Sequence, residues 1–270
     1  MKRKIPLKTV YYSDPLQDDF AGTNITADVV DENYDFAPDG LIFKIGSKVL
    51  RIIAMPIIWF LEKVVYGITI KNKKALKGLK GCYLYGNHTG CYDAFTPNLL
   101  SFPYASTKII VSPDAVSIKG LKTIVKMLGG VPTPSRQNGM KKFMRTIDKL
   151  HEKNYNIAIY PEAHIWPYYT GVRPFKDTSF RYPVKSGAPV VAFFTAFQKP
   201  EGLFKFLRRS KKIVYVSEVF YPSTDLSPKK AQLKLRNQVY DFMKECSYKY
   251  SDYEVIGYEK IEENILDEAA

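Results

Sequence analysis

Residues 82–93 read CYLYGNHTGCYD, and this stretch decides the fold. Its first part, Cys82–Gly86, is a short apolar run that ends in glycine, which is typical of a buried β-strand. Asn87, His88 and Asp93 follow at the point where this strand ends. Open α/β folds bind their ligands at the carboxyl ends of the sheet strands. We therefore expect a central sheet, with a functional loop directly after this strand.

Short apolar runs continue to alternate with amphipathic stretches along the rest of the chain. Helices are expected over residues 113–128, over Met140–Leu150, and after the Ser227-Pro228 pair, which suits a helix start. This alternation predicts an α/β domain at residues 67–250, with a mostly parallel central sheet flanked by helices. The further expected strands are Lys108–Val111, Ile157–Tyr160, Val190–Phe194 and Ile213–Val216.

Charge is unevenly distributed along the 270 residues, which carry 40 Lys+Arg and 27 Asp+Glu for a formal net charge of +13. Residues 14–39 contain eight acidic and no basic residues, and residues 251–270 contain seven acidic residues and one basic residue. The intervening residues 41–250 hold 35 basic and 12 acidic residues. Such a surplus attracts polyanions, namely an anionic membrane, nucleic acid or phosphorylated small molecules. A basic surface can also serve solubility alone.

The two acidic segments are expected to flank the basic domain. Residues 1–40 are predicted to form an extended or poorly ordered arm that could lie against the basic body, and residues 251–270 an acidic tail. No long apolar run follows the basic N-terminus, so a secretory signal is not expected. The three cysteines form no Cys-x-x-Cys pair, which favours a reducing compartment.

Between the arm and the α/β domain, Leu41–Val65 is dominated by apolar residues with a fringe of basic ones. Pro56 is expected to kink or divide the helix, and Trp59 suits a membrane interface. The longest uncharged apolar stretch, Ile52–Leu61, is well short of the roughly 20 residues that span a bilayer. Residues 41–66 are therefore predicted to be an amphipathic helical anchor on a membrane surface. A pair of core-packing helices is the alternative, which periodicity alone does not distinguish.

His88 and Asp93 are spaced so that their side chains can meet. If the chain turns into a helix after the strand, residue 93 lies just over one turn beyond residue 88, and its carboxylate can accept a hydrogen bond from the imidazole. The carboxylate would fix the tautomer while the other ring nitrogen takes a proton. Cys91 is a rival candidate as a covalent nucleophile. The pair predicts a general base for the hydroxyl of another molecule, or a pair that only orders the turn.

A second polar loop, Pro161–His164, follows the expected strand Ile157–Tyr160. Two of the three histidines, His88 and His164, therefore stand at strand ends beside acidic residues. No two histidines have i, i+4 spacing and the cysteines are scattered, so a metal site is not expected. The aromatic continuation, Ile165–Tyr169, could form a rim that faces lipid or a hydrophobic structural loop.

Residues 87–93 (NHTGCYD) resemble the first motif of the glycerolipid acyltransferase superfamily, whose best-known members are the lysophosphatidic acid acyltransferases. Three further blocks occur in the order that the family has. Residues 129–136 (GGVPTPSR) resemble the second block, residues 160–164 (YPEAH) the third and residues 187–191 (GAPVV) the fourth. Four ordered blocks are far more specific than any one of them.

The resemblance implies transfer of a fatty acyl group from acyl-CoA or acyl carrier protein to a lysophospholipid hydroxyl, with lysophosphatidic acid as the leading acceptor in phospholipid synthesis. His88 would deprotonate the acceptor, Asp93 would orient His88, and the alkoxide would attack the thioester without an acyl-enzyme intermediate. The acyl thioester is a co-substrate, and no cofactor is implied. A peripheral or monotopic protein on an anionic membrane surface, at the cytoplasmic face, is the expected setting, and nucleic acid is not an expected partner.

The third block departs from the family, because residues 163–165 (AHI) stand where the family has Gly-Thr-Arg. The missing arginine is often credited with holding an acceptor phosphate, so the acceptor stays open. Arg136, Arg173 and Lys176 are the remaining candidates for a phosphate ligand, or else are ordinary surface cations.

Glu162 is expected to bind the acceptor hydroxyl or to brace nearby basic residues, with capping of the loop backbone as the alternative. His164 has no counterpart in the family motif; it could bind the acceptor, assist the base or hydrogen-bond within the loop. Two other functions remain open: a thioesterase or transacylase on the same fold, and a non-catalytic basic module that binds RNA or a membrane.

Overall fold

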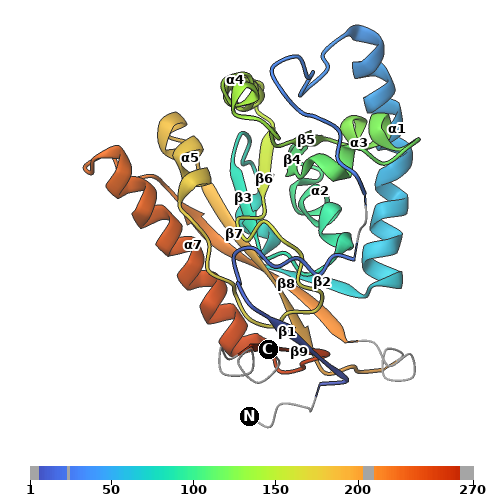
Figure 1. The fold of residues 1–270 in the computed structure, drawn as a ribbon, viewed down its shortest axis with the longest axis vertical. Helices are drawn as coiled ribbons and strands as arrows, with labels where there is room; N and C mark the ends of the chain where they lie inside the picture. The colour runs from blue at the N-terminus through green and yellow to red at the C-terminus, as the bar shows by residue number, and fades with distance from the viewer. Residues whose placement is uncertain (1–5, 23–24, 203–209, 262–270) are drawn as a thin grey trace, which may run out of the picture.

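The computed structural model describes residues 6–22, 25–202 and 210–261, and a seven-stranded sheet forms its centre (Figure 1). The spatial order is β2-β8-β7-β3-β6-β4-β5. Only the β7–β8 pair is antiparallel among these described strands, which confirms the mostly parallel sheet. In this order the strands are Ile68–Lys71, Lys211–Phe220, Val190–Gln198, Tyr83–Gly86, Asn156–Ile159, Thr107–Val111 and Gly130–Pro132.

Helices cover both faces of the sheet. Successive side chains of a strand point to opposite faces, so one strand contributes to two buried clusters. In β3, Tyr83 and Tyr85 belong to one buried cluster, and Leu84 belongs to the other. α4, α5 and α7 pack on the first face and α2 on the second. Their bounds are Met140–Glu152 (α4), Arg181–Ser186 (α5), Pro228–Tyr250 (α7) and Thr96–Ser101 (α2).

The helices expected at Met140–Leu150 and after Ser227-Pro228 are present as α4 and α7. The helix expected over residues 113–128 is interrupted. The chain forms a 3₁₀ turn at Pro113–Val116 and then α3 at Lys122–Met127, with Gly120 between them at a φ of 78°. A glycine with a left-handed backbone conformation cannot continue a right-handed helix. The regularly spaced apolar residues are therefore divided between the 3₁₀ turn and α3.

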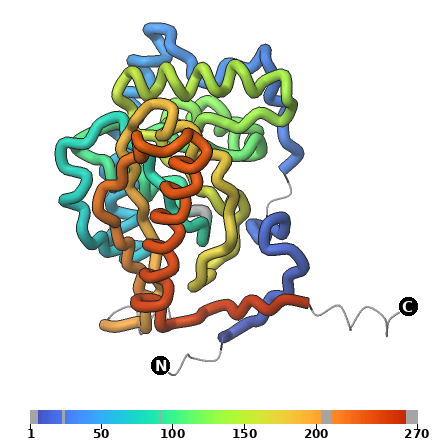
Figure 2. The backbone as a smooth tube through the Cα atoms, turned by 90° about the vertical axis from the view of Figure 1, so that its left-hand side faces the viewer, coloured from blue at the N-terminus to red at the C-terminus, as the bar shows by residue number. Residues whose placement is uncertain are grey.

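The two ends of the described chain meet in a second, two-stranded sheet. β1 (Lys8–Tyr12) pairs in parallel with β9 (Ile256–Lys260), so that Lys8 lies opposite Ile256. Figure 2 shows these blue and red segments side by side below the body of the molecule. Neither strand was predicted, because each is short and leaves most of its side chains exposed or half-buried. The segments expected to be an arm and a tail are thus joined by backbone hydrogen bonds where the structure describes them.

The acidic segment 25–40 lies against the body. Val30 and Phe36 are buried in the core cluster that also contains Phe143 of α4. Lysines of α3 and α4 reach the backbone carbonyls of this segment, whereas its ion pairs are exposed and therefore weak. The carbonyl contacts are Lys126 Nζ to Asp35 O (3.0 Å) and Lys142 Nζ to Glu32 O (2.9 Å).

The helix α1 (Leu41–Phe60) runs along one side of the molecule and leaves most of its apolar residues exposed (Figure 1). Pro56 was expected to kink or divide the helix, and it does not divide it: α1 continues through the proline, and a π-helical turn follows at Leu61–Val65. Of the residues in α1 only Ile58 is buried, which argues against a core-packing helix. No helix in the described ranges is long and apolar enough to cross a membrane. The exposed apolar residues of α1 include Ile42, Ile45, Val49, Ile52, Ile53, Ile57, Trp59 and Phe60.

Candidate active site

The loop after β3 is pinned to the neighbouring strand by Asn87. Its side-chain amide donates to the Thr195 carbonyl (3.2 Å) and accepts from the Thr195 N–H (2.8 Å), and both groups are buried. Gly86 is needed directly before it, because a Cβ there would come within 2.2 Å of the Phe193 ring. The first functional loop therefore leaves the sheet in a fixed direction.

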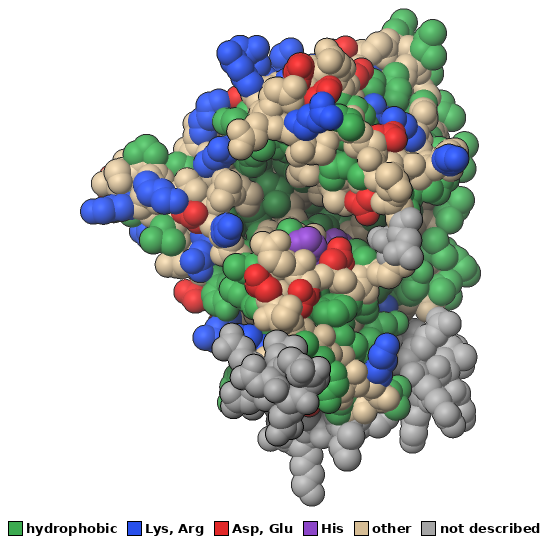
Figure 3. All heavy atoms as spheres, in the orientation of Figure 1, with side chains coloured by type: hydrophobic (Ala, Val, Ile, Leu, Met, Phe, Trp, Pro, Cys, Tyr) green, Lys and Arg blue, Asp and Glu red, His purple; other side chains and the backbone are tan. Residues whose placement is uncertain are grey.

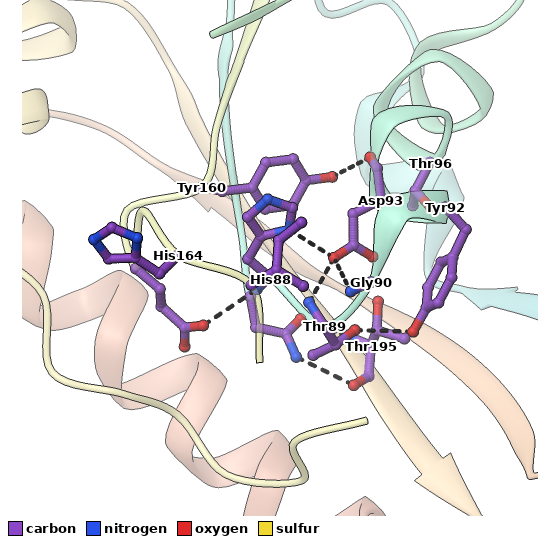
Figure 4. A network of polar contacts seen from close by, with 12 residues as sticks. His88, Thr89, Gly90, Tyr92, Asp93, Thr96, Tyr160, His164 and Thr195 are labelled. Atoms are coloured by element: carbon purple, nitrogen blue, oxygen red, sulfur yellow. Dashed lines mark hydrogen bonds and ion pairs between the residues drawn. The ribbon is translucent and has the colours of Figure 1, made fainter. Parts of the chain in front are cut away.

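Asp93 lies on a 3₁₀ turn, Cys91–Ala94, that folds back toward His88 (Figure 4). Its Oδ2 atom accepts hydrogen bonds from the His88 imidazole Nδ1 (2.9 Å), the Thr89 N–H (2.6 Å) and the Gly90 N–H (3.0 Å). The Asp93 side chain is buried, whereas 17% of the His88 side chain is exposed. When Nδ1 donates to Asp93, Nε2 is the basic nitrogen, so the pair has the geometry of an oriented base. The side chain of Cys91, the rival nucleophile, is outside the described part of the structure.

Tyr160, at the end of β6, holds the other side of the histidine. Its ring stacks on the His88 ring with centroids 4.5 Å apart, and its hydroxyl donates to the Asp93 carbonyl oxygen (2.5 Å). Burial, and then the nearby carboxylates, raise the pKa of Tyr160 far above its ordinary value, so the hydroxyl keeps its proton and remains a donor. The sequence placed Tyr160 in the third motif but assigned it no role.

Glu162 braces the loop from beneath. Its Oε2 accepts from the His88 N–H (3.2 Å) and from Arg173 Nη2 (3.3 Å), and its Oε1 accepts from the Arg173 N–H (3.0 Å). Burial raises the pKa of Glu162, and the Arg173 charge and these backbone donors oppose that rise. Of the roles left open by the sequence, this geometry favours the brace together with backbone capping over contact with an acceptor.

Arg173 is fully buried beside Glu162, rather than at a surface where a phosphate would arrive. Its guanidinium also donates to the His164 carbonyl and stacks over Trp166 at 5.0 Å. His164 itself points away from His88 in Figure 4, and its Nδ1 lies 3.4 Å from Asp19 Oδ2 of the N-terminal segment. Both residues thus stabilise the second loop instead of reaching the basic nitrogen of His88.

Arg136 and Lys176 are both exposed. Arg136 precedes the 3₁₀ turn before α4, and Lys176 follows the buried Phe175 ahead of α5. Within the described residues, no polar contact joins either cation to His88 or to the carboxylates around it. Of the three predicted phosphate ligands, only Arg173 is buried against Glu162, and the phosphate-binding role of Arg136 and Lys176 stays a prediction.

The aromatic segment after His164 is structural. Trp166 is 1% exposed and packs against Tyr12 and Phe20 of the N-terminal segment and against Tyr258 of β9. Its indole N–H donates to the Asp18 carbonyl oxygen (2.8 Å). The alternative of a lipid-facing rim does not hold for this tryptophan, because the two chain ends cover it.

Glu62 is a buried carboxyl group near the site that the sequence did not reveal. The π-helical turn at the end of α1 turns it inward, where Oε2 accepts from Thr96 Oγ1 (3.3 Å) and Oε1 has no partner among the described residues. Burial, with a smaller contribution from Asp93, raises the pKa of Glu62 to about 7, against opposing effects of Thr96, Lys212 and Lys63. One signal was available in the sequence: a single acidic residue interrupts the apolar helix.

The face that carries the site is hollowed. Figure 3 shows histidine side chains in purple beside a hollow whose floor is mainly hydrophobic. Over the described ranges, no group of three or more His, Cys, Asp and Glu side chains could hold a metal ion. An oriented imidazole, on a molecule whose histidine side chains border a mainly hydrophobic hollow, suits a hydroxyl-bearing amphiphile.

Residues 67–195 match the family model Acyltransferase, and this range contains His88, Asp93, Glu162 and Arg173. This part of the chain is an acyltransferase domain. No curated protein gives a significant match to the sequence. Among solved structures, the chain is similar to PlsC, the 1-acyl-sn-glycerophosphate (LPA) acyltransferase from Thermotoga maritima, with a TM-score of 0.50 and 15% sequence identity. That match covers 78% of this chain and 95% of PlsC, and supports the fold.

Proposed function

We propose that this acyltransferase moves a fatty acyl group from an acyl thioester, acyl-CoA or acyl carrier protein, to a hydroxyl of a lysophospholipid, with lysophosphatidic acid as the acceptor. The observation that carries the proposal is the partly exposed His88 side chain, whose imidazole is fixed through Nδ1 by the buried Asp93. The acyltransferase family and the PlsC-like fold support the reaction class.

The proposed reaction proceeds in two proton transfers around one nucleophilic attack. His88 Nε2 takes the proton of the acceptor hydroxyl, and the oxygen attacks the thioester carbonyl to form the new ester bond. The carbon–sulfur bond then breaks, and the imidazolium returns its proton to the thiolate. Asp93 stabilises the imidazolium between these steps, and Tyr160 and Glu162 keep the ring and the loop in place.

We further propose that α1 docks on a membrane surface and that the protein is a peripheral protein of the cytoplasmic face. A continuous row of exposed isoleucines and aromatic residues, with Ile42 at 87% and Trp59 at 54% exposure, supports this role. Exposed apolar residues on that scale are costly in water unless another surface covers them.

Acceptor-dependent release of thiol from a long-chain acyl-CoA tests the reaction. The wild-type protein is expected to release thiol with lysophosphatidic acid, and much more slowly with glycerol 3-phosphate or uncharged lysolipids. Acceptor-independent release would identify a thioesterase. Release with acyl carrier protein alone would change the donor, and no release from either donor with any acceptor would favour a binding module.

A further inference from the structure

A groove of about 1740 Å³ lies between α1, α4 and the 32–39 segment. Neither His88 nor Asp93 lines it. Lys108 lines the groove and lies near the start of β4. Its partner in the sheet is Ile157 of β6, which is in turn the partner of Tyr83 in β3. His88 lies beyond the opposite end of the same strands, because β3 ends three residues after Tyr83, roughly 10 Å further along the strand direction. The groove thus extends toward the end of the sheet opposite to His88, and neither residue of the dyad lines it.

The groove is strongly basic. Ten lysines and arginines line it against three acidic residues, all three of which belong to the 32–39 segment. One of these acids, Asp39, is paired at 3.6 Å with Lys153 in an exposed ion pair. The cations come from both walls, including Lys44, Lys48 and Arg51 on α1 and Lys141, Arg145 and Lys149 on α4.

Two of these cations are held in the groove without a carboxylate partner. Arg51 donates from Nη2 to Asn98 Oδ1 (3.0 Å), and Lys108 Nζ lies 5.0 Å from the centre of the Tyr155 ring. In the described structure no acidic side chain lies within ion-pair distance of either one. Burial, and then the charges of Arg51 and Lys153, lower the pKa of Lys108 to about 8. Mutual repulsion of this kind favours a bound anion, which would stabilise all three cations together.

The walls between the cations are apolar. Ile52, Met55 and Trp59 of α1 line the groove, and Ile52 and Trp59 are also among the exposed apolar residues of that helix. Lys44, Lys48 and Arg51 recur at intervals of four and three residues, so they share one face of α1, beside the apolar one. A ligand that occupies this border needs a negative head and an apolar body.

We propose that the groove binds the phosphate headgroup of an anionic phospholipid, whose chains lie along the exposed apolar face of α1. The inference rests on the membrane docking proposed above, and it adds a headgroup site to that surface. A soluble phosphorylated molecule or nucleic acid would engage the cations but would leave the adjoining isoleucines exposed.

Cosedimentation with two kinds of vesicle tests this site. Vesicles of phosphatidylcholine alone measure docking through the apolar face, and vesicles that also contain phosphatidylglycerol measure the additional binding due to the anionic headgroup. The double variant Arg51→Gln/Lys108→Gln is expected to lose that additional binding, roughly tenfold or more in affinity, and to bind phosphatidylcholine vesicles as the wild type does. The matched control is Lys230→Gln/Lys234→Gln, which removes two exposed charges from α7 on the other side of the molecule and is expected to change affinity less than about twofold.

If the half-buried Arg51 and Lys108 prove necessary for folding, Lys141→Gln/Lys149→Gln removes two exposed charges from the α4 wall of the same groove. Unchanged anionic binding in a folded groove variant would overturn the site, as would an equal loss in the α7 control. If the wild type binds neither kind of vesicle, the proposal that α1 docks on a membrane is itself wrong. Tight binding of free coenzyme A that the groove variant loses would assign the groove to a soluble phosphorylated ligand instead.

Discussion

The catalytic loops and the α1 side of the molecule differ in which side chains they bury and which they expose. Around His88 the charged groups are buried and paired, with Asp93 Oδ2 accepting three hydrogen bonds and Glu162 accepting three more. Along α1 five of the six isoleucines are exposed, and Arg51 has no acidic partner in the described structure. The hydrogen bonding of Asp93 and Glu162 is complete within the chain, whereas the second region exposes apolar side chains that another surface could cover.

The largest effect is expected in the catalytic loops. Asp93→Asn replaces an acceptor of three hydrogen bonds by an amide, which no longer stabilises the His88 imidazolium. We expect kcat to fall by about 10²–10⁴-fold and the free energy of unfolding to fall by about 1–3 kcal/mol, because the Thr89 and Gly90 N–H groups lose their ionised acceptor. Initial rates and urea unfolding measure the two effects. Asp225→Asn, in the exposed β8–α7 loop, is the control, and an equal loss there would contradict the assignment.

The two tryptophans offer a matched pair, one in each region. Trp166 is 1% exposed beneath the chain ends, and Trp59 is 54% exposed on α1. Trp166→Ala is expected to lower the free energy of unfolding by about 3–5 kcal/mol, and Trp59→Ala by less than about 0.5 kcal/mol. Urea unfolding of both variants measures these two changes in the free energy of unfolding. A large loss for Trp59→Ala would mean that α1 is part of the core after all.

Glu62 connects the two regions and predicts a dependence of stability on pH. Its pKa is raised from 4.5 to about 7 in the folded protein, so folding favours the protonated form. That stabilisation is full below about pH 4.5 and is lost as the pH rises to about 7, by about 3 kcal/mol. Glu62→Gln cannot ionise and should therefore be more stable than the wild type at pH 8, with little difference at pH 5. Equal pH profiles of unfolding for the two proteins would show that Glu62 does not titrate in this range.

The smallest effect on stability is expected on the exposed face of α1. Ile42→Lys and Ile45→Lys should each change the free energy of unfolding by less than about 0.5 kcal/mol, yet weaken binding to phosphatidylcholine vesicles by about tenfold. Cosedimentation measures the binding. Thr224→Lys, on an exposed loop far along the chain, adds the same charge without touching the helix. Unchanged binding of the α1 variants would remove this helix from the membrane surface.

Much of the central sheet was predictable because its strands are short apolar runs. β3, β4, β6, β7 and β8 all coincide with such runs, to within a few residues at their ends. Apolar runs do not predict the outer strands, because β5 has only three residues and β1 and β9 are mostly exposed or half-buried. Their pairing depends on contacts between distant segments, which no local pattern contains.

The geometry of the dyad was predictable from spacing, and the surroundings of the dyad were not. His88 and Asp93 are five residues apart, so one turn brings them together. The positions of Glu62 and Arg173 are set by a π-helical turn and by a buried loop, respectively. Arg173 could be read from the sequence only as a cation, and its burial against Glu162 decides between a ligand and a brace.

The central claim is that His88 acts as the base that activates the acceptor hydroxyl. The most direct test compares acceptor-dependent thiol release from acyl-CoA by the wild type and by His88→Ala, at matched concentrations of folded protein and with lysophosphatidic acid present. We expect the variant to keep its fold, as judged by its melting temperature, and to lose about 10²–10⁴-fold in rate. An unchanged rate in a folded His88→Ala variant would contradict the account.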